Sequence, residues 1–138
     1  MVRDDLAFIT NTQPQAVATN GNVIFTTMSR KANCGIKLQD NNIILKKSGY
    51  YLVSGGITFT GAVGNASIQL YKNGSVVVGA ISTESISTAN TQVKTLPVNA
   101  IVRVFNGEIG LITLVNTGVA LNITNASLCI EYKGNVCD

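Results

Sequence analysis

Residues 66–78 read ASIQLYKNGSVVV, and this stretch decides the fold class. Two runs rich in β-branched and other apolar residues flank the pair Asn73-Gly74. A two-residue type I′ turn needs positive φ at both central positions, and Asn followed by Gly tolerates this best. The stretch therefore predicts a β-hairpin and, with it, an antiparallel, all-β protein.

Further strand-like segments lie on both sides of this hairpin, and no window keeps the helical i, i+3, i+4 pattern for long. Strands are expected at residues 6–10, 23–27, 36–39, 43–45, 50–60, 66–72, 75–80, 92–105, 108–115 and 119–132. Loops are expected at residues 29–35 and 82–90, and a second Asn-Gly hairpin turn at 106–107. Pro97 places its strand at a sheet edge or at a bulge. Eight to ten strands, at roughly 8–14-residue spacing, predict a sandwich or barrel.

The composition predicts a single domain that associates with itself. The chain has 138 residues, of which 46% are hydrophobic and only 12% charged. A lone domain with so little surface charge is poorly soluble, so part of its apolar surface is expected to be covered by other subunits. The net charge is +3 and the basic residues are scattered, which favours lysines that protect sheet edges over a nucleic-acid interface.

Residue types that serve catalysis and metal binding are scarce. The chain has no histidine, and Cys34, Cys129 and Cys137 form no C-x-x-C pair, so no zinc pattern is present and no base can activate Cys129. The cysteines are expected to be reduced, with one disulfide through Cys137 as the alternative. Asp4-Asp5 is interpreted as a solvated charge pair. No phosphate-cradling loop, leader peptide or membrane span is visible. The prediction is a protein that is not an enzyme, without cofactor or metal and without nucleic-acid or membrane partners.

Several expected strands carry apolar or small uncharged residues on both faces, at residues 50–59, 109–115 and 127–132. A half-exposed antiparallel strand would alternate between apolar and polar residues. One face of each is therefore expected in the core and the other against neighbouring subunits. The residues expected at that interface are Tyr50, Leu52, Ser54, Thr58, Ile112, Leu114, Cys129 and Glu131. A buried Glu131 would need a neighbour's cation, such as Arg103, and the alternative is an exposed glutamate at the strand end.

Four segments carry a family resemblance: the strand-turn-strand around Gly49-Tyr50-Tyr51, the hairpin at 68–75, the stretch 96–112 with Gly107-Glu108, and residues 126–130. In this order they resemble the tumour-necrosis-factor-like and complement-globular jelly rolls. The likeness is to the bacterial and phage branch, which includes the carboxy-terminal domain of a collagen-like exosporium glycoprotein. The resemblance covers about residues 36–133. It implies an antiparallel jelly-roll sandwich of about ten strands that forms homotrimers, with its inner sheets facing the threefold axis.

The expected organisation is a jelly-roll domain at residues 21–133, preceded at 1–20 by a first strand or an attachment arm, and followed by a tail at 134–138. Resemblance and composition predict a non-enzymatic phage virion protein, a homotrimeric head decoration or head-fibre knob. It would be assembled in the bacterial cytoplasm and would bind capsid or fibre proteins at the virion surface. The absence of a visible leader, collagen repeat or membrane anchor favours this interpretation.

The alternative is a receptor- or carbohydrate-binding tip of a tail fibre, or a bacterial surface adhesin that binds a host-surface glycan. Sugars stack on aromatic faces, so its ligand surface is expected at Tyr71 and in the polar loop that begins Ser82, Thr83, Glu84 and Ser85. A tyrosine beside a hairpin turn also serves as a cross-strand packing residue, which is the plainer interpretation of Tyr71.

Overall fold

Eleven strands make up the part of the chain that the computed structural model describes, which is residues 5–32 and 35–134. They are β1 (Leu6–Asn11), β2 (Gln15–Val17), β3 (Thr27–Ala32), β4 (Ile36–Gln39), β5 (Asn42–Leu45), β6 (Gly49–Gly61), β7 (Gly64–Lys72), β8 (Ser75–Ile86), β9 (Lys94–Val104), β10 (Gly110–Asn116) and β11 (Leu121–Gly134).

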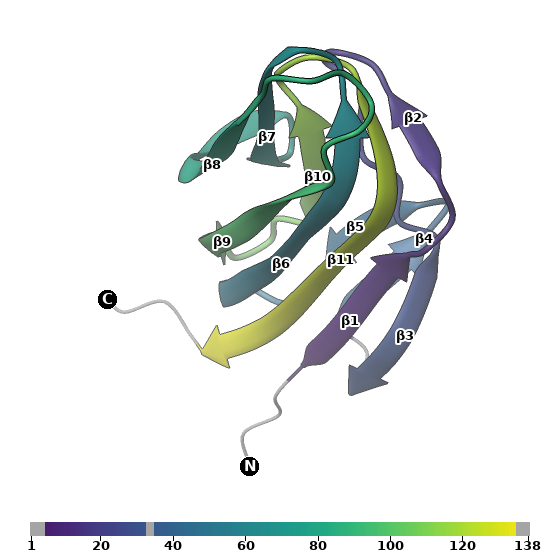
Figure 1. Cartoon of the computed structure of the whole chain (residues 1–138). Helices are drawn as coiled ribbons and strands as arrows, with labels where there is room; N and C mark the ends of the chain where they lie inside the picture. Colours follow the sequence, from purple (N-terminus) through teal and green to yellow (C-terminus); the bar gives the residue numbers. More distant parts are fainter. Residues whose placement is uncertain (1–4, 33–34, 135–138) are drawn as a thin grey trace.

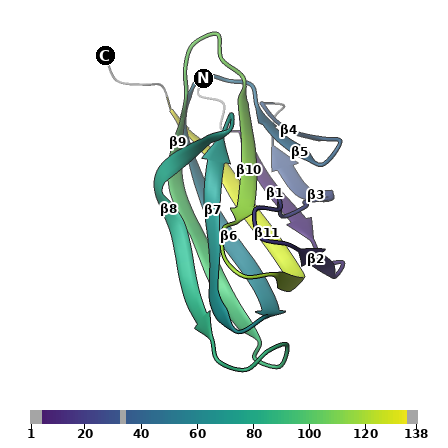
Figure 2. The ribbon, with the colours of Figure 1, turned by 90° about the horizontal axis from the view of Figure 1, so that it is seen from above.

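The strands form two antiparallel sheets that face each other (Figure 1). Sheet A has the order β3-β1-β11-β6-β9, with β2 also paired to β11, and sheet B has the order β4-β5-β10-β7-β8. Seen from above, β8 and β9 lie together on one side of the sandwich, and β3 and β4 lie on the other (Figure 2). The predicted all-β antiparallel sandwich is confirmed. Pro97 lies in β9, the outermost strand of sheet A, so its predicted edge position is confirmed as well.

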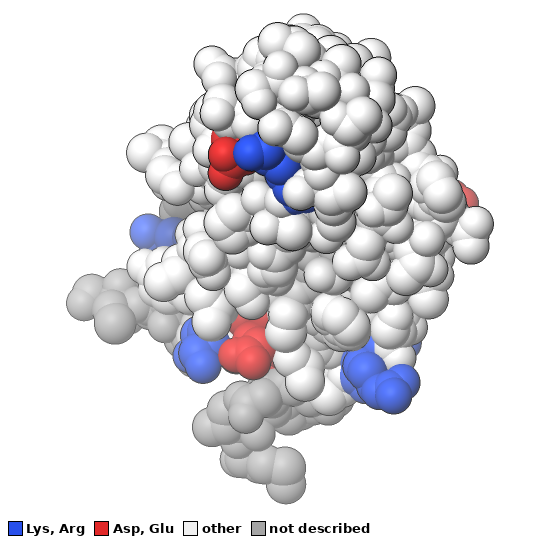
Figure 3. Space-filling model, viewed as in Figure 1, with Lys and Arg blue, Asp and Glu red and all other residues white. Residues whose placement is uncertain are grey.

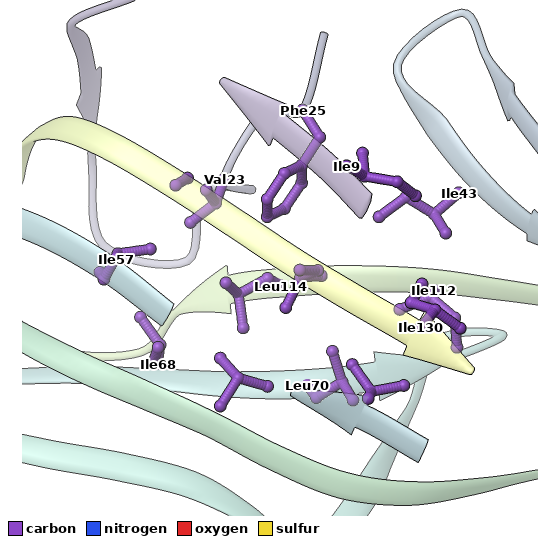
Figure 4. Close-up of a cluster of buried hydrophobic side chains, with 14 of the residues drawn as sticks. Ile9, Val23, Phe25, Ile43, Ile57, Ile68, Leu70, Ile112, Leu114 and Ile130 are labelled. Carbon is purple, nitrogen blue, oxygen red and sulfur yellow. The ribbon is translucent and has the colours of Figure 1, made fainter. Parts of the chain in front are cut away.

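The core lies between the sheets and is built by alternate residues of each strand. Figure 4 shows side chains from both sheets meeting there, among them Ile9, Phe25, Ile57, Leu70 and Ile130. The core corrects one part of the predicted interface. Ile112 and Leu114 are only 2% and 1% exposed, because in β10 they point inward against the opposite sheet and no neighbouring subunit can reach them.

The hairpin predicted at Asn73-Gly74 is confirmed. It joins β7 to β8, and Asn73 and Gly74 have φ values of 51° and 81°, as a type I′ turn requires. Beyond the turn, the β7–β8 register shifts between Gln69 and Tyr71, so β8 bulges away from its partner.

Two tyrosines fix the turn between β5 and β6. The Tyr51 hydroxyl donates a hydrogen bond to the Lys47 carbonyl at 2.6 Å, and the Tyr132 hydroxyl donates to the Ser48 carbonyl at 2.9 Å. Their rings meet edge to face, with centroids 5.3 Å apart. Burial raises the pKa of Tyr51 to about 12, so this hydroxyl remains a donor throughout the physiological range. The Gly-x-Tyr segment is therefore an anchor for the turn.

Three predicted connections differ from the structure. The expected loop at 29–35 overlaps β3, and the expected loop at 82–90 begins with the last residues of β8, which continues to Ile86. Both strands are the outermost of their sheets, where polar residues face solvent and hide the strand pattern.

The Asn106-Gly107 turn is no hairpin, because it joins β9 of sheet A to β10 of sheet B. In the expected strand at 23–27 only Thr27 is in a strand, although Val23 and Phe25 enter the core.

The start of the chain contributes to sheet A. β1 lies between β3 and β11, and Ala7 and Ile9 are fully buried. The Tyr132 amide donates to the Asp5 carbonyl at 2.8 Å, which extends this pairing to the first described residue. Residues 6–17 therefore complete the sandwich on the side of β11.

Candidate functional site

The outer face of sheet A is the candidate site, and strand register determines which side chains it displays. One row across the strands consists of Ala32, Leu6, Glu131, Leu52 and Ile101. The neighbouring row consists of Arg30, Phe8, Cys129, Ser54 and Asn99. Adjacent members of a row are direct cross-strand neighbours, so these side chains form one continuous surface.

This surface exposes apolar side chains that a solvated sheet would not display. Leu6, Phe8 and Ile101 are 37%, 39% and 64% exposed, and Leu52 and Cys129 lie half-buried between them. Figure 3 views the same side of the molecule and shows few charged side chains, with wide uncharged areas between them. Exposed apolar side chains gathered on one sheet face, here interrupted only by Glu131 within the row of Leu6 and Leu52, are typical of a surface that is covered in the working assembly.

Six of the eight predicted interface residues lie on this face. They are Tyr50, Leu52, Ser54, Thr58, Cys129 and Glu131, contributed by β6 and β11. Contact of these residues with another subunit stays a prediction. Sequence reasoning missed Leu6, Phe8 and Ile101. The run Leu6-Ala7-Phe8-Ile9, apolar on both faces, is the signal that both faces of the first strand are covered, although it does not show which sheet the strand joins.

Glu131 has an ion-pair partner on its own strand. Its carboxylate lies 3.6 Å from the Lys133 ammonium, and both side chains are substantially exposed. Arg103, the partner considered for it, instead packs its guanidinium over the Phe105 ring at 4.4 Å from the centroid. In the single chain Glu131 is therefore partly exposed and has a local counterion, and its position at a subunit interface stays a prediction.

Cys129 is a free thiol between Phe8 and Ser54 on the outer face. Burial, assisted by the nearby Glu131 carboxylate, raises the pKa of this thiol. It is therefore protonated at neutral pH and is a weak nucleophile. The predictions for Cys34 and Cys137 lie outside the described residues.

The side of the sandwich formed by β8 and β9 is a second apolar surface. Val76, Val78 and Ile81 of β8 are 49%, 94% and 54% exposed, and Phe105 follows β9 at 50%. Ile101, Val76 and Phe105 line a groove of about 190 Å³ between the two strands, and Lys72 and Arg103, whose cationic groups lie over the Phe105 ring, line it as well. Because Ile101 also belongs to the outer face of sheet A, the two apolar surfaces are continuous.

The opposite side of the sandwich is basic. Arg30 and Lys31 lie on β3 and Lys37 lies on β4, and these are the outermost strands of sheets A and B. Lysine and arginine on an edge strand discourage pairing with another chain. Strand β8, by contrast, carries no basic residue along its full length.

The predicted ligand surface is not brought together. Tyr71 lies next to the hairpin turn, where it pairs with Val76 and Thr113. Ser82 and Ser85 pair with residues 68 and 65 toward the other end of the hairpin. Thr83 pairs with Ser67, which lies four residues before Tyr71 on β7, a distance of about 13 Å along the strand. The structure therefore divides the expected surface into two distant parts, and residues 82–85 belong to a strand.

Remaining features of the surface are shallow. A hollow of about 410 Å³ lies over Gly55, Gly56, Pro97 and Ser127, where the glycines leave the backbone of sheet A bare. Within residues 5–32 and 35–134, no three His, Cys, Asp or Glu side chains gather as a metal site would require. The same residues include no helix long and apolar enough to cross a membrane.

No protein-family model matches the sequence, and no curated protein matches it either. Among solved structures, the chain is similar to murine APRIL at pH 5.0, with a TM-score of 0.74 and 11% identity over 95% of this chain and 100% of that one. It is also similar to the Eiger TNF of S. frugiperda, with a TM-score of 0.78 and 12% identity over 99% and 97% of the two chains. The globular domain of zebrafish complement 1qA matches with a TM-score of 0.67 and 7% identity over 93% and 95%. The protein therefore has a tumour-necrosis-factor-like fold, as the resemblance of its motifs predicted.

Proposed function

We propose that this protein is a non-enzymatic structural module that assembles into a homotrimer through the outer face of sheet A. The observation that carries the proposal is the cluster of Leu6, Leu52, Ile101, Phe8 and Cys129 on one sheet face. The one acidic side chain among them, Glu131, lies between Leu6 and Leu52 and has its counterion, Lys133, on the same strand. Burying apolar surface contributes roughly 25 cal/mol per Å², so covering this face favours association.

The apolar surfaces favour another copy of the chain as the partner. The outer face of sheet A and the β8–β9 side are different surfaces that are both apolar, and they meet at Ile101. If one surface of a first copy binds the other surface of a second copy, the contact is head to tail. When the rotation that relates successive copies is an exact fraction of a full turn, such contacts close into a ring. The number three comes from the resemblance to jelly rolls that form homotrimers.

Matched aspartate variants test the proposal. Leu6 and Leu111 are 37% and 36% exposed, and Ile101 and Ile109 are 64% and 61% exposed. Leu6 and Ile101 lie on the outer face of sheet A. Leu111 lies in β10 of sheet B, and Ile109 lies just before that strand. We expect Leu6→Asp and Ile101→Asp to shift the protein from trimer to monomer in light scattering after size exclusion. Leu111→Asp and Ile109→Asp should leave the trimer intact.

The variants also distinguish lost assembly from lost folding. Circular dichroism of each aspartate variant should retain the β-sheet spectrum, because all four positions are exposed in the single chain. A wild-type protein that is monomeric at micromolar concentration would overturn the proposal. So would trimers that survive both sheet A substitutions.

We further propose that the assembly resides on the surface of a phage particle, as a head decoration or head-fibre knob that binds capsid or fibre proteins. Support comes from the motif resemblance to the bacterial and phage branch of the fold and from the low-charge, Asn-, Thr- and Gly-rich composition. The test is immunogold labelling of purified virions. Label over heads supports the proposal, label over tail tips favours the receptor-binding alternative, and unlabelled particles contradict both.

A further inference from the structure

The chain contains three Asn-Gly pairs, at Asn20, Asn73 and Asn106, and the structure holds them differently. This dipeptide is chemically labile. The glycine nitrogen attacks the asparagine Cγ, a five-membered succinimide ring forms, and the side-chain nitrogen leaves as ammonia. Water then opens the ring to aspartate or isoaspartate. Glycine favours the attack because it has no Cβ to block the approach of its own nitrogen. The step needs a mobile asparagine amide and a glycine N–H that is not held elsewhere.

The Asn73 amide is held at both of its polar atoms. Its Oδ1 accepts a hydrogen bond from the Leu111 amide at 2.7 Å, and its Nδ2 donates to the Glu108 carboxylate at 3.1 Å. The Asn73 backbone amide also donates to the Leu111 carbonyl at 2.8 Å. Turning Cγ toward the Gly74 nitrogen would break these bonds, so ring closure there requires local opening.

At Asn20 the nucleophile is held instead of the amide. The Gly21 nitrogen donates to the Ala18 carbonyl at 2.9 Å, and the Gly21 carbonyl accepts from the Asn116 amide at 2.9 Å. The Asn20 backbone amide donates to the Asn116 carbonyl. These bonds tie the Asn20-Gly21 backbone to Asn116, which is fully buried, so attack by the Gly21 nitrogen requires this pairing to open.

Asn106 and Gly107 have neither restraint. Both are exposed, at the outside of the turn between β9 and β10. Among residues 5–32 and 35–134, nothing hydrogen-bonds to the Asn106 side chain or to the Gly107 nitrogen. Two hydrogen bonds between their neighbours close the turn. The Glu108 amide donates to the Phe105 carbonyl at 3.0 Å, and the Phe105 amide donates to the Glu108 carboxylate at 2.8 Å.

We propose that Asn106 is a site of spontaneous modification, where the folded chain converts asparagine to aspartate or isoaspartate while Asn20 and Asn73 are protected. The exchange of an amide for a carboxylate adds one negative charge to the turn. The new charge lies two residues from Glu108, the carboxylate that pairs with Lys72 at 2.9 Å. Isoaspartate also inserts one backbone methylene into the connection from sheet A to sheet B.

The experiment compares the three sites in one protein. The folded protein and the same protein in denaturant are aged in parallel at mildly alkaline pH, and peptide mapping by mass spectrometry follows each asparagine. In denaturant the three pairs should react at similar rates, because each is the same dipeptide. In the folded protein we expect Asn106 to keep a rate near its denatured value, and Asn20 and Asn73 to slow by about tenfold or more.

Two variants complete the test. Gly107→Ala adds a Cβ to the attacking residue and should slow the reaction at Asn106 alone, also in denaturant, where the strain of an alanine at the φ of 81° found in the folded turn plays no part. Glu108→Ala removes the acceptor of the Asn73 amide and should accelerate Asn73 in the folded protein. Equal protection of all three sites, or faster loss of Asn20 or Asn73 than of Asn106, would overturn the proposal.

Discussion

Gln69 is a buried side chain whose amide supports the bulged part of β8. Its Nε2 lies 2.9 Å from the Val77 carbonyl, 3.0 Å from the Leu70 carbonyl and 3.1 Å from the Ala80 carbonyl. A near-isosteric Gln69→Leu change removes the donor and leaves buried acceptors without partners, so we expect a loss of about 1–3 kcal/mol in unfolding free energy. Urea denaturation measures it.

The matched control is Gln39→Leu, at an exposed position at the end of β4. Its unfolding free energy should stay within about 0.5 kcal/mol of wild type. Hydrogen exchange adds a second readout, since the Gln69 variant should lose protection at 77–80 first. An unfolding free energy unchanged by Gln69→Leu would mean that the carbonyls of the bulge are satisfied by water.

Glu108 makes stability depend on pH in the acid range. Hydrogen bonds from the Phe105 amide and then from Lys72 lower the pKa of this carboxyl below its ordinary value of 4.5. Because the folded-state pKa is the lower one, the stabilisation is fully present above pH 4.5 and is lost as pH falls through the folded-state pKa. We expect Glu108→Gln to flatten this part of the pH–stability curve, by about 1 kcal/mol or less because the site is partly exposed.

The comparison for Glu108 is Glu84→Gln, whose carboxylate meets Lys94 at the longer distance of 3.6 Å. Thermal unfolding of the three proteins between pH 3 and 7 provides the curves. Parallel curves for wild type and Glu108→Gln would contradict the assigned role of the Phe105 and Lys72 bonds.

At the scale of elements, the turn between β10 and β11 is fastened to β7. The Thr117 amide donates to the Ser67 carbonyl at 2.9 Å, and the Val119 amide donates to the Asn65 carbonyl at 3.0 Å. A Cβ on Gly118 would lie 2.2 Å from the Asn65 oxygen and 2.7 Å from the Ser67 nitrogen. Both are backbone atoms that cannot move without disturbing β7, so Gly118→Ala should cost about 1–3 kcal/mol.

Gly107→Ala is the control for this element, because a Cβ there meets no atom within 4 Å although φ is 81°. It should cost only the strain of that backbone conformation, about 1–2 kcal/mol. Chemical denaturation of both variants ranks them. If Gly118→Ala is the milder change, the turn is not fastened as described.

Elements could be predicted from the sequence where local chemistry alone determined them. Asn73-Gly74 specified its own turn through the φ values it tolerates, and Tyr51 and Val53 marked the buried face of β6. Asn106-Gly107 is the same dipeptide, but the strands on its two sides belong to different sheets. Which sheet a strand joins depends on contacts with residues distant in sequence. β3 was missed because an outermost strand needs few apolar residues.

The candidate site was predictable in part for the same reason. Leu52 and Cys129 were identified from strands that are apolar on both faces, and the structure places them on the outer face of sheet A. The same argument failed for Leu114, because alternation shows that a strand has two faces without showing which one the opposite sheet covers. Phe8 was missed because its strand could not be assigned to a sheet from sequence.

At the scale of the whole molecule, the proposed trimer would couple folding to concentration. Association that stabilises only folded chains raises the unfolding temperature with protein concentration. We expect the melting temperature to fall by about 3 °C for each tenfold dilution of the wild type. Ile101→Asp should melt at one temperature at all concentrations. Calorimetry over two decades of concentration decides between these outcomes, and a wild type without this dependence would contradict the trimer.

The pairing of β1 with β11 has a mechanical consequence. The two strands are antiparallel, and the first residue of one, Leu6, lies opposite Glu131 near the end of the other. A force that pulls these two ends apart meets the ladder one hydrogen bond at a time, so the strands would peel open instead of sliding past each other in shear. A molecule tethered at one end of the chain and loaded at the other would yield first along this seam. If only one end of the chain bore the load, the two strands would not be pulled apart at this seam.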